Sequence, residues 1–203
     1  MIESLSDDDK ESIIVIQADV TDPQQVETMV EQVTNTFGKI DIAIHNSGIV
    51  KSVPSVSMSY EDWKKVLDVN LTGVFLCARS VGRQMIKQQH GVILNIGSMS
   101  GTIVNTPQPQ ISYNASKAGV IQLSKSLAME WAKYNIRVNT LSPGYIDTDF
   151  TVQDLVSEWK WHIPLQRLGD TSELQALALF LASDASSYVT GANYILDGGY
   201  TSI

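Results

Sequence analysis

The chain is poor in cysteine, in basic residues and in long apolar runs. Its single cysteine, Cys77, excludes an internal disulfide framework and any paired-cysteine metal or redox site, so no metal is expected. Fourteen Lys and Arg against 22 Asp and Glu give a formal charge of −8 without a basic cluster, which argues against nucleic acid and anionic membranes as partners. No apolar run approaches about 18 residues, and the acidic stretch 1–11 does not resemble a signal peptide. We therefore expect a cytoplasmic protein.

What the chain does contain is an alternation of short β-branched runs and longer amphipathic stretches. With 203 residues and 43% hydrophobic residues, it can bury the core of one domain. The pattern predicts strands at 13–18, 40–45, 92–96, 136–141 and 194–196, and helices at 23–37, 60–89, 112–134 and 171–182. Asp22 and Pro23 read as the start of the first helix, Gly38 as its end, and Ser59 as the cap of the second. Such alternation predicts an α/β fold, a doubly wound parallel sheet with helices on both faces.

Small and polar residues follow the predicted strands. They are Asp19 and Val20, Asn46 to Gly48, Gly97 to Gly101, and Ser142 to Tyr145. One such segment alone is typical of an ordinary turn. Ligands in these sheets bind beyond the carboxyl ends of the strands, so four segments together indicate a cleft.

Tyr113 and Lys117 lie four residues apart in a helical segment, on one helix face. An ammonium group close to a phenol favours the phenolate and lowers the tyrosine pKa. A pKa near 7 would require roughly 4 kcal/mol of differential stabilisation, which is feasible in a cleft walled off from water. Tyr113 could then move a proton to or from a substrate oxygen. The alternative is a surface Tyr/Lys pair on an amphipathic helix.

Two further polar residues could serve the same chemistry. Ser98, directly after a strand, could hold a substrate oxygen beside the phenol; the competing hypothesis, a nucleophilic serine, lacks both the G-x-S-x-G pattern and a histidine at a suitable spacing. Asn70 lies inside an apolar helical stretch, where its amide needs partners. It is either a structural amide with a local kink or the anchor of a water leading to Lys117.

Six motifs occur in order along the chain, and together they resemble one family. They are N-S-G at 46–48, V-N-L-T-G-V-F at 69–75, S-M-S-G at 98–101, Y-N-A-S-K at 113–117, S-P-G-Y-I-D-T at 142–148 and L-D-G-G-Y at 196–200. The set is similar to that of the short-chain dehydrogenase/reductase family, from Ile13 to Thr201. The segments around Gly97–Gln110 and Glu130–Ile146 resemble fungal polyol dehydrogenases in particular, of the D-arabinitol 2-dehydrogenase type.

The resemblance implies a nicotinamide-dependent oxidoreductase with a Rossmann-like fold that acts on a sugar alcohol or the matching ketose. Tyr113 would be the general acid/base, Lys117 would lower its pKa, Ser98 would orient the substrate oxygen, and Asn70 would complete a proton relay. The implied cofactor-binding residues are Asp19, Val20, Asn46, Gly48, Tyr113, Lys117, Pro143, Gly144, Ile146 and Thr148. NAD is the expected cofactor, with NADP as the alternative.

The resemblance also implies a substrate lid and an oligomer. Residues 150–168, with Trp159, Trp161 and His162, fall where the family's lid lies, although plain core packing would also explain these aromatic residues. Helices 60–89 and 112–134 correspond to the pair through which the family forms homo-oligomers.

The chain departs from the family at its beginning, because it has no glycine before Gly38. The family's glycine-rich turn, which binds the pyrophosphate, is therefore missing, along with about 60–80 residues or two βα units. We expect a single domain, 1–203, that is truncated at its N-terminus, with strand 13–18 left without a partner and an exposed edge on strand 40–45. Two alternatives to an active dehydrogenase stay open: an inactive short isoform that assembles with a full-length partner, and a non-enzymatic binding module.

Overall fold

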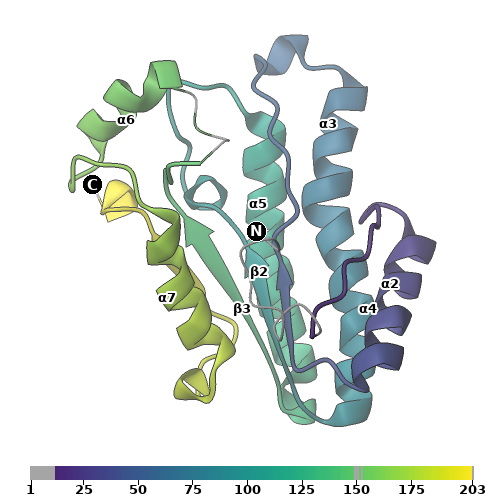
Figure 1. Ribbon diagram of the computed structural model, residues 1–203. Coiled ribbons are helices and arrows are strands. Elements are labelled where there is room, and N and C mark those ends of the chain that lie inside the picture. The colour runs from purple at the N-terminus through teal and green to yellow at the C-terminus, as the bar shows by residue number, and fades with distance from the viewer. Residues whose placement is uncertain (1–11, 149–150, 152, 203) are drawn as a thin grey trace.

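The computed structural model describes residues 12–148, 151 and 153–202. Four parallel strands form one sheet in the order β1-β2-β3-β4. The strands are β1 (Ile42–His45), β2 (Gly91–Ile96), β3 (Ile136–Pro143) and β4 (Asn193–Leu196). The helices are α2 (Pro23–Phe37), α3 (Tyr60–Leu67), α4 (Gly73–Gln88), α5 (Ile111–Trp131), α6 (Val156–His162) and α7 (Thr171–Ala182). The predicted α/β class with a parallel sheet is confirmed (Figure 1).

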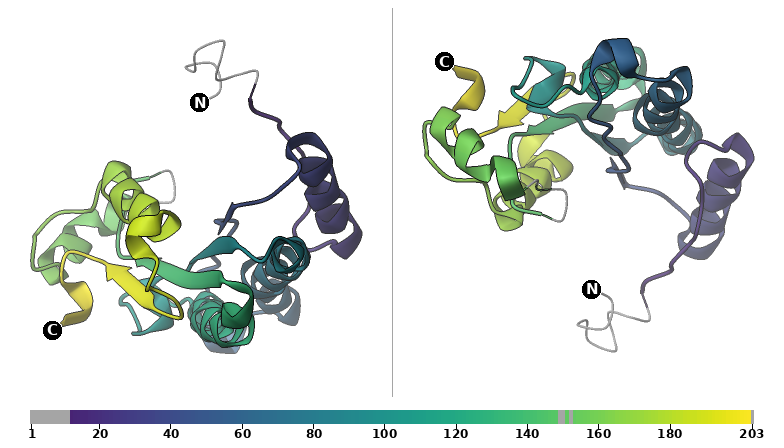
Figure 2. Two further views of the ribbon diagram at one scale, coloured as in Figure 1. Left: turned by 90° about the horizontal axis from the view of Figure 1, so that it is seen from below. Right: turned by 90° about the horizontal axis from the view of Figure 1, so that it is seen from above.

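Helices cover both faces of the middle of the sheet. On one face, α4 and α5 pack on the strands and α2 packs against α4; on the other face lies α7 (Figure 2). The strands alternate between these two layers, as successive residues of a strand must. Ile93 of β2 and Val138 of β3 belong to the core under α4 and α5, whereas Leu94 and Leu141 pack with Leu181 of α7. The prediction of a doubly wound sheet is therefore correct for β2 and β3.

The edge strand β1 is covered on one face only. Ala43 and His45 face the α4 layer, but Ile42 and Ile44 point to the other face, where no helix of the described chain covers them. Ile44 is 51% exposed as a result. The expected exposed edge at residues 40–45 is confirmed.

Residues 13–18 do not form the predicted strand, whereas the expectation that they lack a partner strand is confirmed within the described chain. These residues run beside α2 and away from β1, without strand pairing (Figure 2). Four consecutive β-branched residues satisfy the sequence pattern, but a strand also needs a neighbour for its backbone groups. The turn and helix that follow are as predicted: Asp22 caps α2 with bonds from Gln24 and Gln25, and Gly38 ends it at φ +79°.

The predicted helix 60–89 is interrupted. Ser59 caps α3 as expected, but residues Asp68–Thr72 form a π-helical turn before α4 begins. The predicted local kink at Asn70 is therefore present, in the form of a widened turn. Residues 150 and 152 of the predicted lid lie outside the described residues; within the rest of it, a short 3-10 turn and α6 follow one another.

Candidate active site

The turn after β2 holds Ser98 against α5. The Ser98 hydroxyl accepts a hydrogen bond from the Ser100 amide at 3.1 Å and so caps the short 3-10 helix Met99–Gly101. A Cβ placed on Gly101 would lie 2.7 Å from the carbonyl carbon of Lys117 and 2.8 Å from the amide nitrogen of Ala118. Both are backbone atoms of α5, so only glycine lets this turn come so close to the helix.

Tyr113 and Lys117 face this turn from α5. Lys117 Nζ donates to the carbonyl oxygen of Ile96 at 2.7 Å and lies 5.6 Å from the centroid of the Tyr113 ring. Ser98 is hydrogen-bonded to Tyr113. The structure thus brings three of the four predicted catalytic residues together, and the alternative of an exposed Tyr/Lys pair is excluded because Lys117 is only 4% exposed.

Burial sets the ionisation of this pair. It raises the pKa of the Tyr113 phenol above its ordinary value, against the smaller opposite effect of the hydrogen bond with Ser98. It lowers the pKa of Lys117 to about 8. Burial of the phenol sets the direction of the shift in this structure, and the expectation that Lys117 lowers the Tyr113 pKa stays a prediction. At neutral pH, Tyr113 is a neutral phenol and Lys117 is mostly charged.

Asn70, the fourth predicted catalytic residue, braces the site from the π-helical turn. It is fully buried, and its amide donates to Ile49 O at 2.9 Å and to Ser116 Oγ at 3.1 Å. Its oxygen accepts from Ile49 N at 2.8 Å. Asn70 thus ties the strand-end loop after β1 to α5, one residue before Lys117. This geometry is that of a structural amide, and the role in a water relay stays a prediction.

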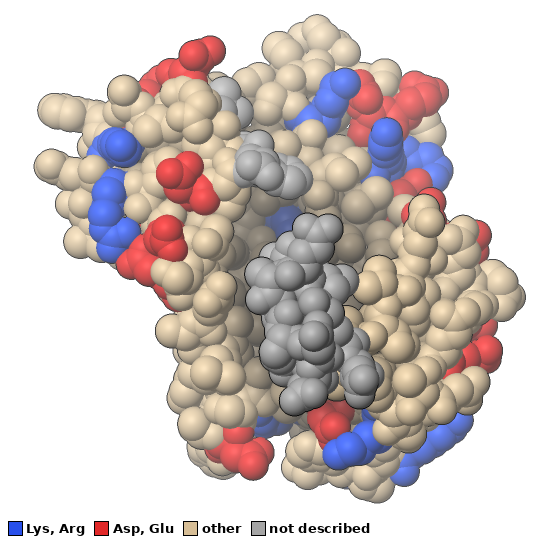
Figure 3. Space-filling model, in the orientation of Figure 1, with Lys and Arg blue, Asp and Glu red and all other residues tan. Residues whose placement is uncertain are grey.

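A cavity of about 630 Å³ opens between these elements. Figure 3 shows one face of the molecule hollowed between two sides, with acidic and basic side chains interspersed on the rim. The residues predicted from sequence that line the cavity are Asn46, Gly48, Ser98, Tyr113, Lys117, Pro143, Gly144, Ile146 and Thr148. A Cβ on Gly48 would stand 3.6 Å from Asn70 Oδ1 and 3.7 Å from Lys117 Nζ, so the missing side chain keeps open the space in front of the ammonium.

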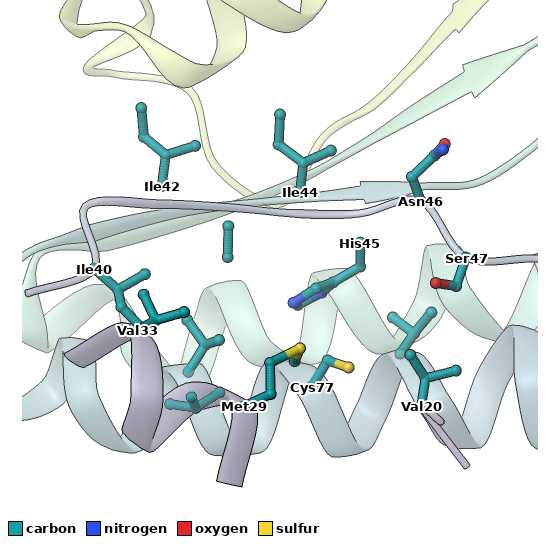
Figure 4. Close-up of a pocket in the computed structure, with 15 residues that line it drawn as sticks. Val20, Met29, Val33, Ile40, Ile42, Ile44, His45, Asn46, Ser47 and Cys77 are labelled. Carbon is teal, nitrogen blue, oxygen red and sulfur yellow. The ribbon is translucent and has the colours of Figure 1, made fainter. Parts of the chain in front are cut away.

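Two predicted cofactor residues lie elsewhere. Val20 lines a second, apolar cavity of about 310 Å³ between α2, α4 and β1, and Asn46 borders both cavities (Figure 4). Asp19 lines neither cavity; its carboxylate accepts from the amide and the hydroxyl of Thr21, both at 2.8 Å. Their roles in adenine contact stay predictions.

Sequence reasoning missed part of the cavity wall. Asn105 and Gln108 line it, and their amides donate, at 3.2 and 2.8 Å, to the hydroxyl of Tyr145, which belongs to the predicted cleft segment 142–145. Trp159, assigned either to a lid or to core packing, is only 5% exposed and also lines the cavity, and the lid stays a prediction. Three amide side chains in the short segment 105–110, after the Ser98 turn, were a signal for this wall.

Neither a metal-ligand cluster nor a serine–histidine pair is found among the described residues of the site. No group of three or more His, Cys, Asp or Glu among the described residues could hold a metal ion. No histidine is among the described residues that line the cavity, so Ser98 has no imidazole base there. Within the same residues, no helix is both long and apolar enough to cross a membrane.

Comparison with known proteins assigns a family to this geometry. A family model described as Enoyl-(Acyl carrier protein) reductase matches residues 1–201. The NADP-dependent mannitol dehydrogenase of Hypocrea jecorina is 46% identical over 190 residues, which are 92% of this chain and 71% of that relative. The ribulose-forming D-arabinitol 2-dehydrogenase of Candida tropicalis is 44% identical over 190 residues, 89% of this chain and 67% of the relative.

A solved structure has the same arrangement of elements. The crystal structure of a short-chain type dehydrogenase/reductase from Mycobacterium marinum superposes with a TM-score of 0.92 at 44% sequence identity. The match covers 96% of this chain and 79% of that one.

Proposed function

Because this chain belongs to the short-chain dehydrogenase/reductase family of NAD(P)-dependent oxidoreductases, we propose that it transfers a hydride between a nicotinamide dinucleotide and a sugar alcohol/ketose pair. One observation carries the proposal: Ser98, Tyr113 and Lys117 meet on the wall of one cavity. The polyol class is supported by the names of the relatives, which are mannitol and D-arabinitol dehydrogenases. A D-arabinitol-like polyol is the specific substrate expected from the sequence, and ribulose is the ketose that the name of the Candida relative contains.

The residues present fit the nicotinamide half of the cofactor. Space is open in front of the buried Lys117 ammonium, where Gly48 has no side chain. Five further predicted cofactor residues line the same cavity: Asn46, Pro143, Gly144, Ile146 and Thr148. For the pyrophosphate, the described residues offer no glycine-rich turn at a helix N-terminus. When bound, the nicotinamide supplies the hydride acceptor or donor.

The proton is moved by the chain's own residues. Ser98 and Tyr113 hold the reacting oxygen between two hydroxyl groups. In ketose reduction, the phenol of Tyr113 gives its proton to that oxygen; in polyol oxidation, its phenolate takes the proton back. Because burial raises the Tyr113 pKa, the phenol is the dominant form at neutral pH. We therefore expect the rate of reduction to be higher near pH 7 and the rate of oxidation to rise at alkaline pH.

The dinucleotide is either NAD, expected from the sequence, or NADP, which the name of the Hypocrea relative contains. A turnover assay of the 203-residue chain decides this point along with the reaction. NADH and NADPH are each offered with D-fructose and D-ribulose, and absorbance at 340 nm is followed. We expect ketose-dependent oxidation of one of the two cofactors.

Tyr113→Phe tests the assignment of the proton donor. We expect turnover to fall by about 10²–10⁴-fold, because the reacting oxygen loses its proton source. Tyr188→Phe is the matched control, since Tyr188 is fully exposed and lies outside the cavity. Equal activity of Tyr113→Phe and the unmutated chain would remove Tyr113 from the chemistry.

We also propose self-association and a cytoplasmic location. α3, α4 and α5 carry Tyr60, Phe75, Ile111 and Met129 among their exposed large apolar side chains. An apolar outer helix layer is the surface expected to be covered in a homo-oligomer. Fractionation of the source cells tests the location.

A further inference from the structure

The far wall of the cavity is a fixed hydrogen-bonded unit. Tyr145, directly after Gly144, stacks on Trp159 of α6 with ring centroids 4.1 Å apart and planes within 9°. The Tyr145 hydroxyl accepts from Asn105 Nδ2 and from Gln108 Nε2. Gln108 Oε1 in turn accepts from Trp159 Nε1 at 3.3 Å. We call these four residues, Asn105, Gln108, Tyr145 and Trp159, the amide wall.

A second set of bonds fixes the amide wall to the catalytic turn. Gln110 is buried, and its Nε2 lies 3.2 Å from Ser100 Oγ and 3.4 Å from Asn105 Oδ1. Ser100 is two residues from Ser98 and donates its own amide to it. The amide wall is therefore held in register with the reacting centre, which a specificity surface requires.

The amide wall still has unused hydrogen-bonding capacity. An amide side chain has two protons and an oxygen with two lone pairs. Within the described residues, Gln108 uses one proton for Tyr145 and one lone pair for Trp159, which leaves one donor and one acceptor. Asn105 Nδ2 likewise uses one of its two protons. Burial raises the pKa of Tyr145 to about 12, so its hydroxyl also stays neutral.

The charge of the lining is as informative as its polarity. Of the described residues that line the cavity, Lys117 is the only charged one, and its ammonium is bonded to Ile96 O beside Tyr113. No arginine and no second lysine lines the cavity within that part of the chain, so a carboxylate on the substrate would be desolvated without a cation to pair with.

We propose that the amide wall is the specificity surface of this site, that Asn105 and Gln108, held in place by Tyr145, bind the hydroxyl groups beyond the reacting carbon, and that the site therefore takes neutral polyols and ketoses and rejects sugar acids. The proposal rests on the proposed function and deepens it. A site built to hydrogen-bond substrate hydroxyls rejects analogues that lack them, because its own polar groups are then left unpaired.

Calorimetric titration tests the proposal in the full chain carrying Tyr113→Phe, so that no turnover contributes heat. The probes are D-mannitol, D-gluconate with the same number of carbons and one carboxylate, and hexan-2-ol with a single hydroxyl. We expect D-mannitol to bind most tightly. Adding Gln108→Leu should weaken mannitol binding about tenfold, because one donor and one acceptor are lost. Adding Tyr145→Phe, which removes a single oxygen, should weaken it by a comparable factor.

Gln32→Leu on α2 is the matched control, since it is the same chemical change at an exposed position outside the cavity, and it should leave binding unchanged. Three results would overturn the proposal: gluconate or hexan-2-ol binding as tightly as mannitol, no mannitol binding at all, or unchanged binding in both wall variants. Failure of the proposed function would give a different result: the chain with Tyr113 intact would bind mannitol but would not interconvert any polyol and ketose.

Discussion

At the scale of single residues, Lys117 combines a functional position with an energetic cost. Its side chain is almost fully buried, and its ammonium donates a hydrogen bond to the carbonyl oxygen of Ile96. An ammonium group at such a position loses most of its hydration, which is why its pKa falls from 10.5 to about 8. Burying this charge therefore lowers the stability of the folded chain at a position that the site uses.

This cost predicts a pH-dependent stability. Between about pH 8 and 10.5, the unfolded chain keeps the Lys117 proton and the folded chain releases it. Because the unfolded state then binds more protons, raising the pH favours folding. Relative to Lys117→Met, the free energy of unfolding of the unmutated chain should rise by about 3 kcal/mol from pH 7 to pH 10.5.

Urea unfolding at both pH values measures this difference. Lys125→Met, at an exposed position of α5, controls for the loss of a lysine elsewhere. Parallel pH profiles of the unmutated chain and Lys117→Met would contradict the prediction.

Ser98, Tyr113 and Lys117 could be predicted because their motifs indicate where they lie: Ser98 at the end of a strand, and Tyr113 and Lys117 on one face of a helix. The ionisation of Tyr113 could not, since it depends on how much water the fold excludes, and the sequence names only the neighbouring charge. For the amide wall, the sequence offered the amide side chains of segment 105–110 as a signal, but not their partners. The contacts of the amide wall join residues 37 to 51 positions apart, and isolated asparagines and glutamines are common in loops.

At the scale of elements, the contact between the Ser98 turn and α5 fixes the site. Gly101 lies against the backbone of α5 at Lys117 and Ala118, so the turn and the helix cannot separate without moving Ser98 away from Tyr113. The positions of two elements are thus set by the absence of one side chain.

Gly101→Ala should therefore separate the turn from the helix. A Cβ within 2.8 Å of two backbone atoms forces a shift, and overpacking of this kind costs about 1–3 kcal/mol. A displacement of about 1 Å at reacting groups lowers turnover about a hundredfold. Thermal unfolding and the 340 nm assay measure the two effects.

Gly38→Ala is the control. An alanine there is strained by the backbone φ of +79°, but its Cβ meets no other atom, and Gly38 is far from Gly101 in the sequence. It should lower stability and leave turnover per folded molecule unchanged. Turnover of Gly101→Ala equal to that of Gly38→Ala would show that the turn does not position Ser98.

Element positions followed from the sequence wherever local signals determine them. Asp22, Pro23, Gly38 and Ser59 begin or end helices through bonds within their own turns, so the sequence contains the whole reason. The strand predicted at residues 13–18 does not form, because a strand depends on a partner and the local pattern of residues does not indicate one. The π-helical turn at Asn70 was expected only as a kink, since its form follows from contacts with Ile49 and Ser116.

At the scale of the whole molecule, the outer surface of α3 to α5 is where self-association is proposed. Phe75 of α4 is 40% exposed. The guanidinium carbon of Arg79 lies over its ring, 5.5 Å from the centroid of the Phe75 ring. Phe75→Glu should convert an oligomer to a particle of 22.3 kDa in light scattering after size exclusion, because it places a carboxylate in the apolar contact.

Tyr188→Glu provides the control, since Tyr188 is exposed and follows α7 rather than the proposed helices. It should keep the mass of the unmutated chain. A Phe75→Glu chain that keeps its oligomeric mass would place the interface elsewhere.

The incomplete cover of β1 affects how the sheet exchanges its backbone hydrogens with solvent. The Val92 amide donates to Asp41 O, so alternate residues of β1 bond to β2, and the amides of Ile42 and Ile44 point to the open edge. β2 lies between β1 and β3, whereas β1 has one strand neighbour in the described chain. Deuterium uptake should therefore differ between the strands, being fastest at these two amides and slowest in β2. Slower exchange at Ile42 and Ile44 would then report that something covers this edge.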